Sequence, residues 1–146
     1  MSLKHIDYID LPPHAKRGGF DHAAVHCGIG RLYLAHTAND SLDVIDCRSN
    51  RYLHSIPDLS GVAGALVSED QNLVFTSNRG GNTIGILSAA TGDLLEKVRV
   101  GIGPNGLAYD PSRNLLLAAN VGDPAIPGSH TVSMVDVAAR TLLGAV

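Results

Sequence analysis

The sequence has no tryptophan, only two cysteines and a low fraction of charged residues, 17%. Two cysteines are too few for the disulfide framework that stabilises many small secreted domains. Eleven basic against fourteen acidic residues give a net charge of −3, and no basic cluster offers a surface for nucleic acid or anionic lipid. The longest apolar stretches, such as Leu115–Ala119, are far too short to cross a bilayer. These absences predict a soluble protein that binds neither nucleic acid nor membrane.

The N-terminal residues 1–7 include acidic and polar side chains where a secretory signal would be apolar. We therefore expect a cytoplasmic protein, or a periplasmic one if the sequence is part of a longer chain. A length of 146 residues is that of about one domain, and 45% hydrophobic residues are enough to form a core.

A repeat of about forty residues runs through the chain. Leu32, Leu73 and Leu115 anchor three similar apolar segments that are 41 and then 42 residues apart. Each unit has four short apolar segments separated by clusters of Gly, Asn, Asp and Pro, which is typical of β-strands joined by turns. Helical stripes longer than about ten residues are missing. The period and this pattern predict an all-β repeat protein.

The second and third strands of each unit are apolar on successive residues, as in a sheet covered on both faces. This favours a β-propeller, with blades of four antiparallel strands at 20–56, 61–100 and 104–146 in one domain spanning 1–146. Residues 4–11 fit the outer strand of a further, closing blade. Three blades and one strand make an incomplete ring, because propellers typically have four to eight blades. We expect further blades from the same longer chain or from another chain.

Three segments of blade 3 carry a family resemblance: Pro104–Pro111, Leu115–Asn120 and Val132–Asp136. With Leu73–Asn78 and Leu32–Thr37, they resemble the YVTN/YncE-type β-propeller family over nearly the whole chain from about residue 20. The last residue of the family's Tyr-Val-Ala-Asn element is Asn in blades 2 and 3 and is expected to be Thr in blade 1. The resemblance implies a propeller fold and leaves the function open.

In a propeller, the loops that join strand four to strand one and strand two to strand three share one face above the central channel. Polar loop residues on such a face are the default ligand site. Six extra residues around 123–129 in blade 3 suggest a binding elaboration there. The candidate ligand-binding residues are His22, His36, Asn39, Asp40, Asn78, Arg79, Asn105, Asn120 and Asp123.

Several of these candidates also have a purely structural interpretation. Asn78 and Asn120 end a strand before a loop, where Asn tolerates left-handed backbone and bonds neighbouring backbone groups. A structural or surface role is also commoner for a histidine than a ligand role. No nucleophile–base pair can be assigned, so no catalytic residue is predicted. The main hypothesis is a binding or scaffold module, without a cofactor, that recognises a small molecule or a protein.

A second hypothesis comes from Pro104–Leu107, which resembles the metal-binding run of SMP-30/gluconolactonase-type propellers. The resemblance implies that Asn105 binds a divalent metal such as calcium, which polarises a lactone carbonyl for hydrolysis. His22 occupies the matching position in blade 1. Neither glutamate of the sequence maps to this face, so the remaining ligands have to come from blades outside this sequence.

Overall fold

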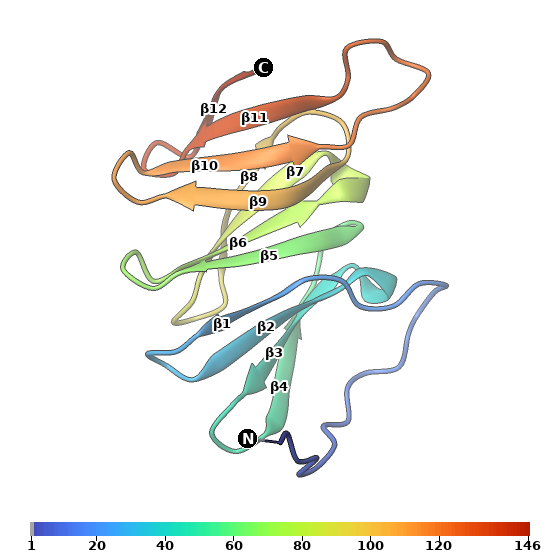
Figure 1. The fold of residues 1–146 in the computed structure, drawn as a ribbon, viewed down its shortest axis with the longest axis vertical. Coiled ribbons are helices and arrows are strands. Elements are labelled where there is room, and N and C mark those ends of the chain that lie inside the picture. The colour runs from blue at the N-terminus through green and yellow to red at the C-terminus, as the bar shows by residue number, and fades with distance from the viewer. Residues whose placement is uncertain (1) are drawn as a thin grey trace.

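A computed structural model describes residues 2–146, so Met1, the first residue of the expected domain, lies outside the described residues. Residues 2–146 form twelve strands in three four-stranded antiparallel sheets, which follow one another along the long axis of the molecule (Figure 1). The predicted all-β fold of three open propeller blades is confirmed. Within residues 2–146, no helix is long and apolar enough to cross a membrane.

Each blade is built from four strands that are consecutive in sequence and paired in that order. Blade 1 contains β1 (Ala23–His26), β2 (Arg31–His36), β3 (Ser41–Asp46) and β4 (Arg51–Ile56). Blade 2 contains β5 (Val62–Ser68), β6 (Leu73–Asn78), β7 (Thr83–Ser88) and β8 (Leu94–Arg99). Blade 3 contains β9 (Pro104–Asp110), β10 (Leu115–Asn120), β11 (Thr131–Asp136) and β12 (Thr141–Ala145).

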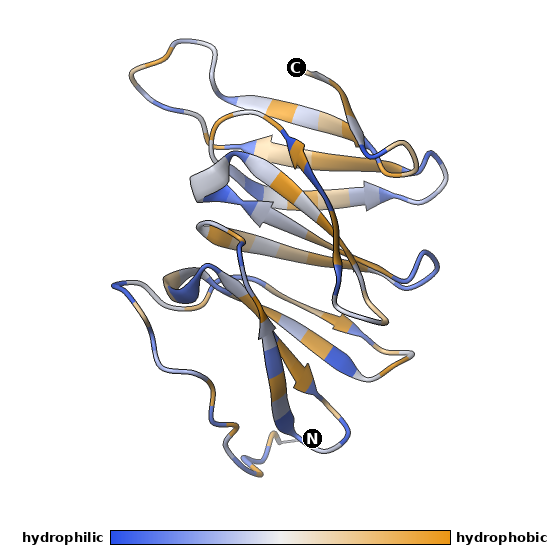
Figure 2. Cartoon of the chain, turned by 180° about the vertical axis from the view of Figure 1, so that it is seen from behind, coloured by the Kyte–Doolittle hydropathy of each residue, from blue (hydrophilic) through white to orange (hydrophobic). Residues whose placement is uncertain are grey.

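Local sequence sets the tight turns between these strands. Asn72 comes directly before β6 and Asn114 directly before β10. Both have left-handed backbone, with φ of 53° and 52°. Asp40 and Asn82 adopt the same conformation between the second and third strands, with φ of 51° and 52°. Asn and Asp tolerate this region better than other residues with a Cβ, so the turns recur with the repeat. Figure 2 shows that hydrophobic positions are concentrated in the strands between them.

The strand bounds correct the sequence alignment of blade 1 by one residue. β2, β6 and β10 begin at Arg31, Leu73 and Leu115, which are 42 residues apart in both steps. Anchoring the repeat on Leu32 was therefore wrong, because a shift of one residue moves every side chain to the other face of a sheet. The Tyr33 side chain, for example, packs into the core between blades 1 and 2.

The same shift changes which residue of blade 1 matches the strand-ending asparagines. His36 ends β2 as Asn78 ends β6 and Asn120 ends β10. The expected substitution by Thr37 was therefore wrong, and Thr37 instead begins a short 3₁₀ turn, η1 (Thr37–Asn39). A histidine at this position bonds through two ring nitrogens on opposite sides of the ring, so it can join two separate partners.

Two apolar cores hold the blades together. The first joins blade 1 to blade 2 and includes Tyr33, whose hydroxyl donates a hydrogen bond to the Ala89 carbonyl oxygen at 2.8 Å. Burial raises the pKa of the Tyr33 hydroxyl above its usual value. The second core joins blade 2 to blade 3, with Phe75 and Ile86 packed in one cluster with Leu116. The facing sides of neighbouring blades are thus stabilised by each other rather than by a helix.

The expected strand over residues 4–11 does not form in this structure. The segment has no strand pairing and is mostly exposed, with Ile6 77% and Tyr8 82% accessible. A strand needs a neighbouring strand for its backbone N–H and C=O groups, and blade 1 already has its own four strands. The assignment of this segment to a further blade stays a prediction.

The core between blades 2 and 3 gives a direct test of blade packing. Leu116 is fully buried in that core, whereas Leu143 on the last strand is 62% exposed. We expect Leu116→Ala to lower the free energy of unfolding by about 2–5 kcal/mol, because it leaves a cavity in packed interior. Leu143→Ala is the matched control and should change it by less than about 0.5 kcal/mol. Urea unfolding followed by circular dichroism measures both, and equal effects would contradict this packing.

Candidate functional site

The loops between the second and third strands lie against the links that lead into the first strands. The Arg79 backbone N–H donates to the Gly61 carbonyl at 3.2 Å, and Val121 donates to Gly103 at 2.9 Å one repeat later. Gly61 has left-handed backbone, and a Cβ there would lie 2.6 Å from the Gly80 nitrogen. We call the surface formed by these loops and links, at residues 19–22, 37–40, 57–61, 79–82, 100–103 and 121–130, the loop face.

The two strand-ending asparagines of the predicted site bond within their own blades. Asn78 is 1% exposed and its Nδ2 donates to Thr83 Oγ1 at 3.1 Å. Asn120 is 5% exposed, and its Nδ2 donates to Thr131 Oγ1 at 2.8 Å and Ser133 Oγ at 2.9 Å. Both side chains tie the second strand to the third where the loop begins. Their geometry supports the structural interpretation.

His36 takes the same position in blade 1 and is fully buried. Its Nδ1 lies 2.8 Å from Asp43 Oδ2, and its Nε2 lies 2.9 Å from His14 Nδ1. The other Asp43 oxygen accepts a hydrogen bond from Ser55 Oγ at 2.5 Å, and Ser55 Oγ lies 2.9 Å from the Tyr52 hydroxyl. A buried carboxylate needs such partners, because burial without them is costly. His36 is therefore part of a buried polar chain that crosses blade 1.

Asn39, at the end of η1, binds the N-terminal segment rather than its own blade. Its Oδ1 accepts a hydrogen bond from the Ala15 backbone N–H at 2.6 Å. Its Nδ2 donates to the Pro13 carbonyl oxygen at 3.0 Å. We call residues 13–16 the strap. The Asn39 amide thus makes a two-point contact with the strap backbone.

Asp40 adds an ion pair to the same segment. Its Oδ2 lies 2.5 Å from Lys16 Nζ, and its Oδ1 accepts a hydrogen bond from the Gly61 N–H at 2.6 Å. The hydrogen bond from Lys16 lowers the pKa of the Asp40 carboxyl below its usual value, and the Gly61 amide adds to this shift. Asp40 therefore links the strap, blade 1 and the entry to blade 2.

His22 and Asn105 lie at the starts of first strands in different blades. His22 is exposed, its Nδ1 lies 2.8 Å from Asp21 Oδ1, and its backbone N–H donates to the Ala63 carbonyl at 3.1 Å. The Asn105 carbonyl oxygen accepts a hydrogen bond from Ser77 Oγ at 2.6 Å. Asn105 Oδ1 is buried and has no hydrogen-bond partner among the described residues. Blade 2 separates these two candidate metal ligands.

These donors do not fit a divalent metal. Calcium takes six to eight oxygen ligands, and Asn105 offers one amide oxygen while His22 offers only nitrogen. In the part of the chain that the structure describes, no three His, Cys, Asp or Glu side chains are placed to share a metal ion. The chain's own residues therefore do not make the site that the gluconolactonase resemblance implies.

The remaining two candidates lie in the loops of blades 2 and 3. Arg79 is exposed on the short turn η2 (Arg79–Gly81), and its side chain contacts no acidic group within residues 2–146. Asp123 closes the insertion of blade 3: its N–H donates to Ser129 Oγ at 2.8 Å, and its Oδ1 accepts from the Ala125 N–H at 2.9 Å. Arg79 is thus available to a partner, whereas Asp123 shapes its own loop.

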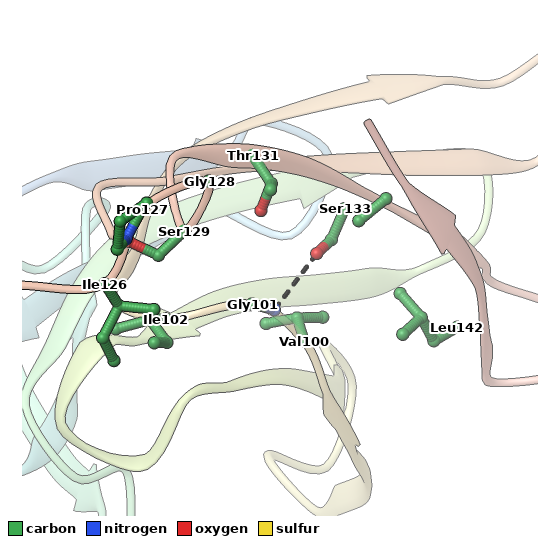
Figure 3. Close-up of a pocket in the computed structure, with 11 residues that line it drawn as sticks. Val100, Gly101, Ile102, Ile126, Pro127, Gly128, Ser129, Thr131, Ser133 and Leu142 are labelled. Carbon is green, nitrogen blue, oxygen red and sulfur yellow. Dashed lines mark hydrogen bonds between the residues drawn. The ribbon is translucent and has the colours of Figure 1, made fainter. Parts of the chain in front are cut away.

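The blade 3 insertion also borders a cavity of about 410 Å³ that the sequence did not predict. Figure 3 shows Ile102 and Ile126 beside each other on one side and Leu142 on the other. Gly101 lines this cavity. One repeat of 42 residues earlier, at the junction of blades 1 and 2, stands the fully buried Leu59. A Cβ at Gly101 would lie 2.5 Å from Asn120 Nδ2, so the glycine there allows a close approach of Asn120 and is not itself a signal for the cavity. No charged side chain is among its lining residues.

Comparison with solved structures places this arrangement of sheets among known folds. Hydrazine synthase from Kuenenia stuttgartiensis superposes with a TM-score of 0.79 at 13% identity, over 91% of this chain and 37% of that chain. U3-55K superposes with a TM-score of 0.72 at 18% identity, over 90% of this chain and 40% of that chain. The WD40 repeats of RRP9 superpose with a TM-score of 0.72 at 18% identity, over 90% of this chain and 39% of that chain. The fold is a partial β-propeller.

The chain spans less than half the length of these propeller structures. Their sequence identities are below 25%, so they show the fold and carry no function to this chain. No known family matches the sequence, and no curated protein matches it.

The roles of Asn78 and its neighbour Arg79 can be separated by stability. We expect Asn78→Ala to lower the free energy of unfolding by about 1–3 kcal/mol, because it leaves buried hydrogen-bonding partners unsatisfied. Arg79→Ala should change it by less than about 0.5 kcal/mol, since the side chain is exposed. Thermal and urea unfolding measure both variants. A destabilised Arg79→Ala protein, or an unaffected Asn78→Ala protein, would show that the roles are assigned wrongly.

The ion pair of the strap predicts a titration. The pKa of Asp40 should lie below its ordinary value of 3.8, and Lys16→Ala should bring it back toward that value. Because the pKa is lowered, the contact with the strap is fully present above pH 3.8 and is lost as the pH falls through the lowered value. Carboxyl chemical shifts followed by NMR against pH measure it. A pKa of Asp40 that is unchanged by Lys16→Ala would contradict the contact.

Proposed function

We propose that this chain forms three blades of a larger β-propeller that acts as a binding or scaffold module. Ile84 and Ile86 of β7 are fully buried beneath blade 3. One repeat later, Val132 and Met134 of β11 occupy the same positions on a face that no further blade covers, and Val132 is 37% exposed. Apolar sheet faces of this kind are normally covered. Further blades, from the same longer chain or from another chain, would cover this one.

The loop face is the proposed recognition surface, for a small molecule or a protein partner. Its strand-ending residues Asn78 and Asn120 are bonded in place, which makes the loops a rigid platform. The observation that carries the proposal is the contact of Asn39 and Asp40 with the strap, because there the loop face already holds a segment of polypeptide. This supports a protein partner over a small molecule.

A metal-dependent lactone hydrolase is the alternative, and one observation favours it. Asn105 Oδ1 is buried without a hydrogen-bond partner in residues 2–146, as a metal ligand missing its ion would be. The other ligands would have to come from blades outside this sequence, since His22 lies two blades away. We therefore favour the binding module. Membership of the YVTN/YncE-type family and a cytoplasmic location also stay predictions.

The uncovered face of blade 3 tests the proposal. We expect the chain to associate with itself or to bind a hydrophobic dye such as anilinonaphthalenesulfonate, because this apolar face lacks a covering sheet. Met134→Lys should reduce both association and dye fluorescence, since it places a charge on that face. Gln71→Lys, in an exposed turn, is the matched control and should change neither. Sedimentation equilibrium and dye titration measure the outcome; a folded monomer that binds no dye would overturn the proposal.

A further inference from the structure

The strap is held through its backbone by a contact that does not depend on its side chains. The Asn39 amide accepts from the Ala15 N–H at 2.6 Å and donates to the Pro13 carbonyl at 3.0 Å. A side-chain amide carries one acceptor and one donor side by side, so it can pair with two peptide groups that flank one residue. Here the flanked residue is His14. Asn39 is thus placed to bind the backbone of a short polypeptide segment, whatever its side chains.

Two side chains of the strap add recognition of sequence. His14 Nδ1 lies 2.9 Å from His36 Nε2, and the two rings meet edge to face with centroids 5.0 Å apart. The ring of Phe20 lies 5.2 Å from that of His14 and 4.3 Å from that of His36. Asp43 bonds the opposite nitrogen of His36 and so fixes the ring that receives His14. The site therefore favours an imidazole at this place.

The second recognition point is two residues further along the strap. Lys16 Nζ pairs with Asp40 Oδ2, whose other oxygen is held by the Gly61 N–H. The carboxylate is therefore fixed by the protein before a cation arrives. Together with the imidazole site, this gives a recognition pattern of His-x-Lys. The two peptide groups beside His14 are bound as well.

The strap itself is not part of the core. Its residues 13–16 are all exposed, and the preceding residues 2–8 are exposed as well. Its contacts with blade 1 are a few polar bonds near solvent, which contribute little stability each. By contrast, His36, which receives His14, is fully buried and bonded to the fully buried Asp43, and Asp40 is held by the Gly61 N–H. A preformed site with a weakly held occupant is one in which the occupant can be exchanged.

We propose that the loop face of blade 1 is a peptide-binding site for His-x-Lys segments, and that the strap is a resident occupant which a matching segment of a partner protein displaces. The inference rests on the proposed binding function and names the class of partner for that surface. The partner contributes an imidazole, a cation two residues later and the two peptide groups beside the imidazole. Asn39, Asp40 and His36 receive them.

A synthetic peptide with the sequence Leu-Pro-Pro-His-Ala-Lys-Arg, which copies residues 11–17, is the probe. Fluorescence anisotropy of the labelled peptide with the full chain measures binding, and NMR amide exchange at Ala15 reports release of the strap. We expect binding in trans, together with faster exchange at Ala15. A peptide with Ala in place of His and Lys should bind at least about tenfold more weakly, as expected when two polar contacts are lost.

Two variants of the chain move the affinity in opposite directions. Asn39→Ala should weaken peptide binding at least about tenfold, because the site loses its backbone contact. Lys16→Ala should strengthen it, because the resident strap competes less well. Gln71→Ala, an exposed amide in the β5–β6 turn, is the matched control and should leave affinity unchanged. Unchanged thermal unfolding of Asn39→Ala confirms that the site, rather than the fold, was altered.

The inference is overturned if neither the natural chain nor Lys16→Ala binds the peptide, or if Lys16→Ala binds it more weakly. It is also overturned if the strap exchanges between two copies, seen as a dimer that Lys16→Ala abolishes. Sedimentation and dye binding of Met134→Lys depend on the uncovered face of blade 3 and not on the strap. Failure of the peptide test alone therefore leaves the proposed module standing.

Discussion

A four-stranded sheet that is apolar on both faces has to be packed between two neighbours, and the rest of this structure depends on that requirement. Blade 2 meets it: Val74 and Leu87 pack toward blade 1, and Phe75 and Ile86 pack toward blade 3. Because the apolar positions recur with the repeat, each blade is placed on the previous one in the same way. This places all the loops between second and third strands on one face, the loop face that we propose as the recognition surface.

The same requirement explains why so many polar residues near the loop face have structural roles. A strand that ends between two sheets brings polar groups into the interior, and these groups need partners. The Asn78 and Asn120 side-chain nitrogens bond hydroxyl groups within their own blades, and His36 bonds Asp43. In the proposed function, recognition therefore involves residues just beyond the strand ends, such as Asn39, whose side chain bonds the strap rather than its own blade.

The sequence predicted the three blades well, because apolar period and turn residues act over short distances. It placed blade 1 one residue out of register, since Leu32 and Arg31 are both plausible first residues of a strand and only pairing with Asp46 decides between them. It also predicted a strand over 4–11 from the place of this segment in the repeat, although pairing needs a neighbour. Asp43, in a strand position held by Gly85 and Ser133 in the other blades, was the signal for the buried polar chain that sequence reasoning missed.

By itself, the sequence determined that there are three similar β units and where their turns lie, because backbone preference and apolar pattern depend on residues that are close in sequence. Only the tertiary structure decided that residue 14 lies against residue 36 and that the strap lies on Asn39 and Asp40. It also decided that Gly101, where Leu59 stands one repeat earlier, lines a cavity. Such contacts join segments distant along the chain, and their geometry follows from how whole sheets pack, which no local pattern encodes.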